Sequence, residues 1–250
     1  MSMIKVVFFD LGSTLVYSKD PWPPIYERAD RALVDALSSS GIRIDLADLH
    51  TGSGGFLGTY YDNNTRDNVE YTTFNLLREM LSQKGYRNNP EPILRAALAA
   101  MYAVTQQNWY PEEDAISTLE SLKNLGYHLG LISNTSDDKN VQGIVDRWRL
   151  RPLFEAIVTS AALGIRKPDP RIFQVALDHF RLPPQAAAMV GDLLNADVLG
   201  ANQSGIYSIW ITRRVQLPDE GELVIQPQAV VTALQQIPAL LADIENDPEE

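Results

Sequence analysis

The sequence predicts an α/β fold in which a doubly wound, Rossmann-like parallel sheet carries a helical domain inserted after its first strand. Residues 6–9 are four apolar residues in a row, the pattern of a strand buried on both faces of a sheet. From Pro111 onward, strand and helix patterns alternate, as they do in parallel sheets. Residues 1–16 and 110–250 are therefore predicted to form the sheet domain, and residues 17–109 the inserted domain.

The first strand ends at Asp10, and the turn Gly12-Ser13-Thr14 follows closely. Open α/β sheets bind ligands outside the carboxyl ends of their strands, at the point where the strand order reverses, so Asp10 is a candidate site residue. Asp and Gly are also common in ordinary turns, because they tolerate unusual backbone angles. This stretch alone leaves both interpretations open.

The inserted domain contains three stretches whose apolar residues recur at helical spacing. They cover residues 23–40, 69–81 and 93–104. Gly41 and Gly85 are placed to end the first two helices. The polar, glycine-rich stretch 51–66 shows no such spacing. We expect helices here and no strand.

In the sheet domain, apolar runs predict the remaining strands, and amphipathic stretches predict the helices between them. Further strands are predicted over residues 127–132, 154–159, 187–190, 207–212 and 229–231. Helices are predicted over residues 119–125, 141–148, 171–180, 196–203 and 234–241.

The composition narrows the classes of partner. The chain has 250 residues, 45% hydrophobic and 21% charged, and no run near the roughly 18 apolar residues that span a bilayer, so no membrane segment is expected. The amino terminus lacks a secretory signal pattern, which favours a cytoplasmic enzyme. A net charge of -11 argues against nucleic acid as a partner. With no cysteine and three histidines, a metal would be held by oxygen or histidine ligands.

Polar side chains follow four of the predicted strands, directly or across a short connecting segment. In chain order they are Asp10 with Thr14, Ser133 with Asn134, Lys167, and Asp192 with Asp197. The motifs read strand-Asp-x-x-x-Thr, Ser-Asn, Lys-Pro-Asp-Pro and Gly-Asp-x-x-x-x-Asp-x-x-Gly-Ala. Together they resemble the four motifs of the haloacid dehalogenase-like (HAD-like) hydrolase superfamily, in its phosphatase branch with a helical cap. The resemblance covers nearly the whole chain and implies that residues 17–109 form the cap.

The resemblance also implies a metal site. The first and fourth motif strands would be neighbours, about 5 Å apart, so Asp10 and Asp192 would share a cation. An all-oxygen ligand set suits Mg²⁺. The carbonyl of Gly12 is implied as a further ligand, and Asp197 is implied to hold a metal-bound water or Lys167. From the residues alone, Asp197 could instead cap a helix.

A nucleophilic role for Asp10 requires positive charge, because a carboxylate attacking a phosphate meets like charge before an aspartyl-phosphate can form. Mg²⁺ and Lys167 would supply it. Thr14 and Ser133 would donate hydrogen bonds to the phosphoryl oxygens, and Asn134 would position its neighbours. Two structural alternatives stay open, in which Lys167 is a solvated surface residue and Ser133 a helix N-cap.

Gly12 departs from the family pattern, which usually has a second aspartate here as general acid and base. Such catalysis is typically worth about 10²–10⁴ in rate, so its absence matters. Another acid in the cap could substitute, with Asp20, Glu27 and His50 as candidates. The substrate could instead have a leaving group that needs little protonation, or the protein could bind ligands with little turnover.

The sequence therefore predicts a Mg²⁺-dependent phosphatase of a small phosphorylated metabolite. The alternative is a catalytically weak binding or regulatory protein. Haloacid dehalogenation is less favoured, because those relatives work without a metal and Asp192 here preserves a metal carboxylate. The aromatic residues Phe56, Tyr60, Tyr61 and Trp109 could line a substrate pocket or pack in the core.

Overall fold

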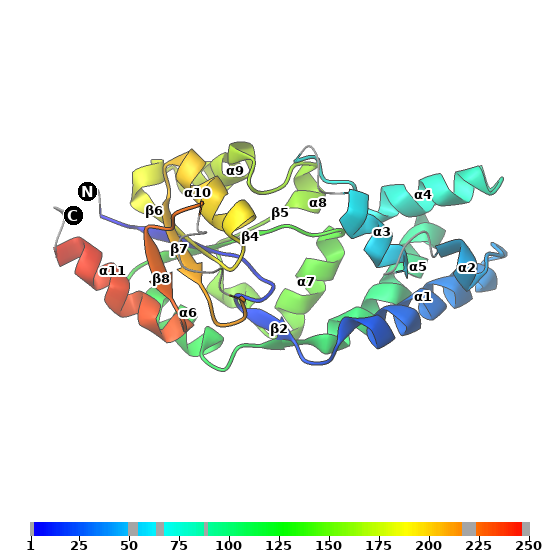
Figure 1. Cartoon of the computed structure of the whole chain (residues 1–250), viewed down its shortest axis with the longest axis horizontal. Coiled ribbons are helices and arrows are strands. Elements are labelled where there is room, and N and C mark those ends of the chain that lie inside the picture. The colour runs from blue at the N-terminus through cyan, green and yellow to red at the C-terminus, as the bar shows by residue number, and fades with distance from the viewer. Residues whose placement is uncertain (1–2, 50–54, 64–67, 88–89, 217–223, 247–250) are drawn as a thin grey trace.

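A six-stranded parallel sheet forms one end of the molecule (Figure 1). The computed structural model describes residues 3–49, 55–63, 68–87, 90–216 and 224–246. The sheet has the order β5-β4-β1-β6-β7-β8, which confirms the predicted doubly wound topology. Its strands are β1 (Val6–Phe9), β4 (His128–Ser133), β5 (Ala156–Thr159), β6 (Ala187–Gly191), β7 (Tyr207–Ile211) and β8 (Ala229–Val231). The order reverses between β1 and β6, where such sheets place their sites.

Helices cover both faces of the sheet, because the inner strands β1, β4 and β6 are buried on both sides. Val7 and Phe9 of β1 point into one core, together with α6 (Ala115–Asn124), α7 (Asp138–Arg147) and α11 (Ile237–Asn246). Val6 and Phe8 point into the other core, together with α9 (Pro170–Phe180) and α10 (Leu199–Ser204). Successive residues of β1 thus alternate between two buried layers.

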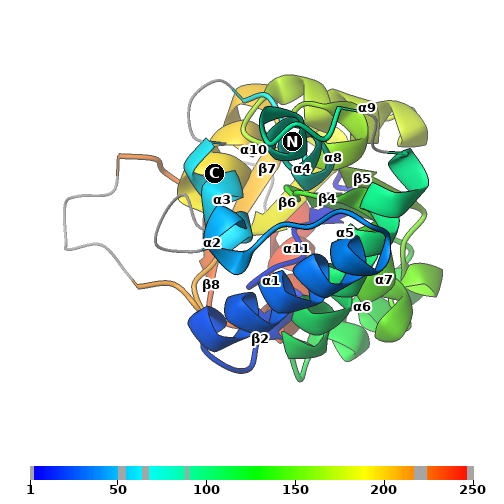
Figure 2. The ribbon, with the colours of Figure 1, turned by 90° about the vertical axis from the view of Figure 1, so that its right-hand side faces the viewer.

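The other end of the molecule is a block of helices with its own hydrophobic core. Figure 1 shows these helices apart from the sheet, and in Figure 2 they lie in front of it. The helical block consists of α1 (Trp22–Ser39), α2 (Leu46–Leu49), α3 (Gly55–Asn63), α4 (Thr73–Gln83) and α5 (Glu91–Thr105). Leu33 and Leu37 of α1 are fully buried, and α1 ends before Gly41, whose φ of 85° suits a residue without a Cβ. The assignment of residues 17–109 as a separate cap domain stays a prediction.

Two short strands connect the helical block to the sheet. They are β2 (Val16–Ser18) and β3 (Trp109–Pro111), which pair antiparallel outside the main sheet. Neither strand was expected from the sequence, because three residues are too few for an alternating pattern to register. The expectation of no strand in residues 17–109 is therefore wrong at its two ends, where residues 17, 18 and 109 lie in strands.

Two other details differ from the prediction. The glycine-rich stretch contains α3, whose Phe56, Leu57 and Tyr60 are buried at helical spacing. The helix expected from residue 69 begins only at Thr73, because Val69 instead forms an antiparallel bridge with Ile165 of the sheet domain. Both differences follow from tertiary contacts that override local propensity. Within the described residues, no helix combines the length and apolarity needed to cross a membrane.

Candidate active site

Asp10 and Asp192 leave neighbouring strands at the same edge of the sheet. Phe9 of β1 is in register with Val190 of β6, and the aspartates follow one and two residues later. Carboxylate oxygens of Asp10, Asp192 and Asp197 all lie within 4.8 Å of one another. The two strands are thus neighbours, as expected, and their aspartates meet at one edge of the sheet.

Lys167 lies buried between two of these carboxylates. Its Nζ donates to Oδ1 of Asp10 at 2.6 Å and to the carbonyl of Ile132 at 2.7 Å, and it forms an ion pair with Oδ1 of Asp197 at 2.6 Å. Two of the three ammonium protons are thus used in hydrogen bonds, and the contact with Asp197 is an ion pair. With 3% of its surface exposed, Lys167 is not the solvated surface residue of the structural alternative.

Asp197 reaches Lys167 because Gly191 has no side chain. A Cβ on Gly191 would collide with the Asp197 carboxylate, so the close approach depends on the glycine. Asp197 lies in the π-helical turn Leu194–Val198, and its Oδ2 also accepts from the N–H of Leu193 at 3.0 Å. The lysine partner and the capping role were alternatives from sequence, and the structure contains both contacts.

Asn134 fixes the backbone of Lys167 from both sides. Its Nδ2 donates to the Lys167 carbonyl at 2.9 Å, and its Oδ1 accepts from the Lys167 N–H at 2.8 Å. This arrangement agrees with the positioning role expected for Asn134. Ser133 is buried and lines the cavity described below. It does not cap α7, whose N-cap is Asp137, so the alternative of an N-cap at Ser133 is wrong.

Thr14 contacts the carboxylate of Asp192 rather than the open site. It is fully buried, and its Oγ1 lies 3.5 Å from Oδ1 of Asp192, a long contact for an O–H···O hydrogen bond. It is absent from the residues that line the cavity, whereas Gly12 and Ser13 are among them. In this arrangement Thr14 orients Asp192. The contact of Thr14 with a phosphoryl oxygen that the sequence led us to expect would require a shift of its side chain or backbone.

The electrostatics of the site favour a bound cation. Burial raises the pKa of Asp10 to about 6 despite Lys167, and burial together with the charges of Asp10 and Asp197 raises the pKa of Asp192 to about 8. The two carboxylates beside Lys167 outweigh the cost of burial and raise its pKa. Three carboxylates thus face one ammonium group. This oxygen-only donor set with excess negative charge fits Mg²⁺.

A cavity of about 640 Å³ opens from these strand tips toward the helical block. From the block and its connections, the cavity is lined by Trp22, Tyr26, Leu57, Tyr60, Tyr102, Thr105 and Trp109. Two of the aromatic residues singled out in the sequence, Tyr60 and Trp109, therefore line it. Phe56 packs in the core of the helical block instead, and the side chain of Tyr61 lies outside the described part of the structure.

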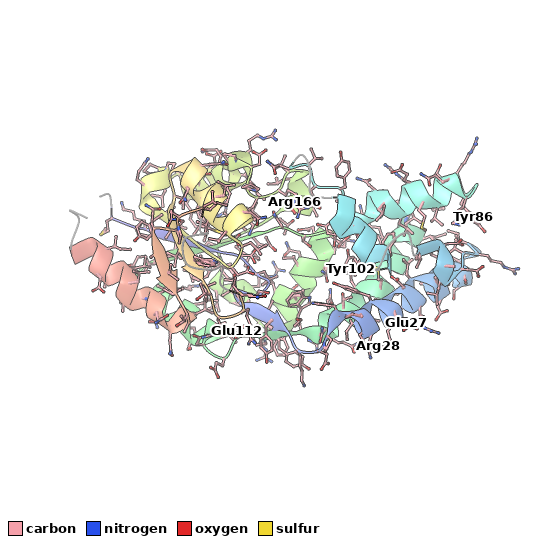
Figure 3. The ribbon with its side chains drawn as sticks, in the orientation of Figure 1. Glu27, Arg28, Tyr86, Tyr102, Glu112 and Arg166 are labelled. Carbon is pink, nitrogen blue, oxygen red and sulfur yellow. The ribbon has the colours of Figure 1, made fainter. Side chains whose placement is uncertain are left out.

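Trp22, Tyr26, Tyr102 and Arg166 were not predicted as cavity residues. Their place depends on how the helical block is set over the sheet, which no local pattern encodes. Figure 3 shows Tyr102 and Arg166 in the middle of the molecule, between the sheet and the block. The position of Arg166, directly before Lys167, was the one available signal.

Neither of the two candidate replacement acids in the described part of the chain, Asp20 and Glu27, lines the cavity. Both are exposed, and Glu27 pairs with Arg31 at 2.7 Å. His50 lies outside the described residues. Among the described lining residues, the acidic ones are Asp10, Asp192 and Asp197, and none is histidine. This geometry gives no support to Asp20 or Glu27 as the acid.

Glu70, which precedes α4, links the helical block to the residues that follow β4 and β5. Tyr60 donates to Oε1 of Glu70 at 2.8 Å, and Ser160 donates to Oε2 at 2.7 Å. The hydroxyl of Ser160 in turn accepts from the N–H of Thr135, directly after Asn134, at 2.8 Å. Burial raises the pKa of Glu70. A buried carboxylate therefore joins the helical block to the loop after β4.

A model of a hydrolase family, the haloacid dehalogenase-like hydrolases, matches residues 4–205. The chain belongs to the haloacid dehalogenase-like hydrolase family. It is 30% identical over 214 residues to a glyceraldehyde 3-phosphate phosphatase of Methanopyrus kandleri, covering 84% of this chain and 85% of that protein. It is also 33% identical over 147 residues to a phosphoserine phosphatase of Thermus thermophilus, covering 59% of this chain and 57% of that protein.

Among solved structures, this HAD-like hydrolase resembles a 2-haloacid dehalogenase of Pseudomonas syringae. The TM-score is 0.68 at 26% identity, with 96% of this chain and 99% of that chain covered. The family and the fold expected from the four motifs are thus confirmed. Both phosphatases and dehalogenases occur among the similar proteins, so the choice between them depends on the site residues.

Proposed function

We propose that this HAD-like hydrolase is a Mg²⁺-dependent phosphatase of a small phosphorylated metabolite, with Asp10 as nucleophile. The observation that carries the proposal is the carboxylate of Asp192 beside Asp10, within a cluster whose negative charge Lys167 only partly balances. Similar proteins named glyceraldehyde 3-phosphate phosphatase and phosphoserine phosphatase support it.

Asp10, Asp192 and the carbonyl of Gly12 would hold the metal. When bound, Mg²⁺ supplies positive charge that offsets the repulsion between the Asp10 carboxylate and a phosphate dianion. A cluster that leaves Asp192 protonated near neutral pH without a cation is suited to such a partner, because the cation favours the ionised form.

Lys167 orients the nucleophile in this proposal. Its hydrogen bond to Oδ1 of Asp10 leaves Oδ2 for attack on phosphorus. The new bond joins Oδ2 to phosphorus, while the bond from phosphorus to the ester oxygen breaks and the leaving group departs with the electron pair. Water then attacks the phosphorus of the aspartyl-phosphate, which restores the Asp10 carboxylate and releases phosphate and a proton. Ser133 and backbone N–H groups at the strand tips would donate to the phosphoryl oxygens.

Haloacid dehalogenation is the second candidate, and the resemblance in fold to a dehalogenase is the observation in its favour. It leaves Asp192 without a role, since the dehalogenase relatives do not use a metal carboxylate. A third candidate is a binding protein with little turnover, which the glycine at position 12 favours.

The test compares phosphate release from a generic aryl phosphate with chloride release from 2-chloropropionate, each with Mg²⁺ and with EDTA. We expect phosphate release only with Mg²⁺ and no chloride release. Asp192→Asn should lower Mg²⁺ affinity by at least tenfold, while the exposed control Asp35→Asn on α1 should not change it. Chloride release that is independent of metal would establish the dehalogenase, and Mg²⁺ binding without any turnover would establish the binding protein.

A further inference from the structure

Three aromatic side chains form one wall of the cavity, which we call the aromatic wall: Trp22, Tyr26 and Trp109. The rings of Trp22 and Tyr26 stack at 15° with centroids 5.2 Å apart. The ring of Trp109 lies 5.2 Å from that of Trp22 at 57°. The indole of Trp148 donates to the backbone carbonyl of Trp109 at 2.8 Å, which fixes the third member. Such a wall favours a flat, apolar group, because aromatic rings gain from stacked and edge-on contacts.

The aromatic wall reaches the position of the missing acid. A Cβ on Gly12 would lie 3.4 Å from Cη2 of Trp109, so the indole lies beside the position from which an acid at residue 12 would project. Of the three carboxylates among the described lining residues, Asp10 has the role of nucleophile, Asp192 that of metal ligand, and Asp197 is paired with Lys167. None of these is available to protonate a leaving group next to the wall.

The charge of the cavity also restricts the leaving group. Lys167 and Arg166 are the only lysine or arginine residues among its described lining. Lys167 already pairs with Asp10 and Asp197 and donates to the carbonyl of Ile132, and Nε of Arg166 lies 3.9 Å from the Glu70 carboxylate. A leaving group with a further negative charge would therefore gain little here, so the lining favours an uncharged one.

These observations lead to one substrate class. We propose that the substrate is the phosphate monoester of a phenol, with its ring against the aromatic wall; this rests on the proposed phosphatase function. A phenol loses its proton at a pKa of about 10, whereas an alkoxide is nearly as poor a leaving group as hydroxide, whose parent water has a pKa of about 15.7. When Asp10 attacks phosphorus, the phenolate leaves with the electron pair of the P–O bond and takes its proton from water. No general acid is required.

Three esters test the role of the leaving group and the role of the aromatic ring separately. Phenyl phosphate offers an aromatic ring and a good leaving group, benzyl phosphate an aromatic ring and a poor leaving group, and cyclohexyl phosphate neither feature. We expect kcat/KM with Mg²⁺ to be at least about 100-fold higher for phenyl than for benzyl phosphate. General acid catalysis, which this site would lack, typically raises the rate of such a reaction by about 10²–10⁴.

The aromatic wall is tested by replacing Trp22. Trp22→Ala should raise KM for phenyl and benzyl phosphate by at least about fivefold and leave cyclohexyl phosphate within about twofold. Trp22→Leu keeps apolar bulk without an aromatic face, so it gives the same test should Trp22→Ala fail to fold. Tyr71→Ala is the matched control, because Tyr71 is a half-exposed aromatic residue outside the cavity lining.

The outcomes distinguish the two proposals. If kcat/KM for benzyl phosphate lies within about tenfold of that for phenyl phosphate, the proposal of a phenolic substrate is overturned. The proposal of a phosphatase is unaffected by that result. An equal rise of KM for all three esters in Trp22→Leu would overturn the role of the aromatic wall. A lack of Mg²⁺-dependent hydrolysis of every ester would overturn the phosphatase proposal and the substrate class with it.

Discussion

Gly12 and Trp109 face each other at van der Waals distance: a Cβ added to Gly12 would lie 3.4 Å from Cη2 of the indole. Gly12 also lies outside the left-handed backbone region, so position 12 accepts a side chain without backbone strain. An acid can therefore be restored at position 12 without a change in backbone conformation. The glycine is thus compatible with substitution, and its effect on catalysis can be measured in a folded protein.

Gly12→Asp should add a general acid beside the nucleophile. We expect kcat/KM for benzyl phosphate to rise by at least about tenfold relative to phenyl phosphate, because only the alkoxide leaving group needs a proton. Gly12→Asn has nearly the same shape and lacks the acidic proton, so it should give no such gain. An equal effect of both substitutions on the two esters would contradict the account of a missing acid.

Mg²⁺ affinity should depend on pH. Burial and the charges of Asp10 and Asp197 raise the pKa of Asp192 to about 8, and burial and the charge of Asp197 raise the pKa of Asp10 to about 6, so the metal-free site holds protons at pH 6. Because the metal requires ionised carboxylates, binding must release those protons. The Kd for Mg²⁺ should therefore fall as pH rises from 6 to 8.5, by at most about tenfold per pH unit for each proton released. Calorimetric titrations that give the same Kd at both pH values would exclude this coupling.

Gly191→Ala should disturb the ion pair between Asp197 and Lys167. The new methyl group would collide with the Asp197 carboxylate, so Asp197 would have to move away from Lys167. Overpacking of this kind costs about 1–3 kcal/mol of stability. Lys167 would lose its ion pair with Asp197 and orient Asp10 less well, so kcat should fall by at least about tenfold. Gly164→Ala is the matched control, because its Cβ would meet no atom within 4 Å, although its φ of 74° carries a strain of its own. Wild-type kcat in folded Gly191→Ala would show that the contact is dispensable.

Glu70→Gln should alter how stability depends on pH. Burial raises the folded-state pKa of Glu70 above its unfolded value, so the folded protein binds a proton more tightly than the unfolded chain. Its contribution is therefore fully present below the unfolded pKa and is lost as pH rises through the folded pKa. Glutamine removes this titration, while the hydroxyls of Tyr60 and Ser160 can still find partners.

The measurement is the free energy of unfolding of wild type and Glu70→Gln in urea at several pH values from 4 to 7. The difference, wild type minus variant, should decrease as pH rises. A difference that stays constant or increases over this range would contradict the assigned pKa direction. Glu27→Gln, at an exposed position of α1, controls for general effects of removing a carboxylate.

The strands of the sheet could be predicted from the sequence because the residue pattern that specifies each strand is local. The apolar run before Asp10 and the runs before Ser133 and Asp192 each specify a buried strand, and the polar residue after each run marks its carboxyl end. The ion pair of Asp197 with Lys167 was one of two alternatives, and Gly191 in the motif Gly-Asp is the residue that permits it.

The cavity wall could not be predicted in the same way. Trp22 and Tyr26 lie on the first turns of α1, where one helical face packs in the block and another faces the sheet. Helical periodicity identifies the apolar side of a helix without saying which of its residues meet a second domain. The link from Glu70 to Ser160 joins residues 90 positions apart and has no counterpart in local sequence.

Phosphate release by Asp10→Asn is the most direct test of the account. The amide keeps the shape of the side chain but cannot act as the carboxylate nucleophile, so with Mg²⁺ and phenyl phosphate the rate should fall at least about 10³-fold in a folded protein. A thermal melt establishes folding, and Asp35→Asn, measured in parallel, should keep the wild-type rate. A folded Asp10→Asn variant within about tenfold of the wild-type rate would contradict nucleophilic catalysis by Asp10.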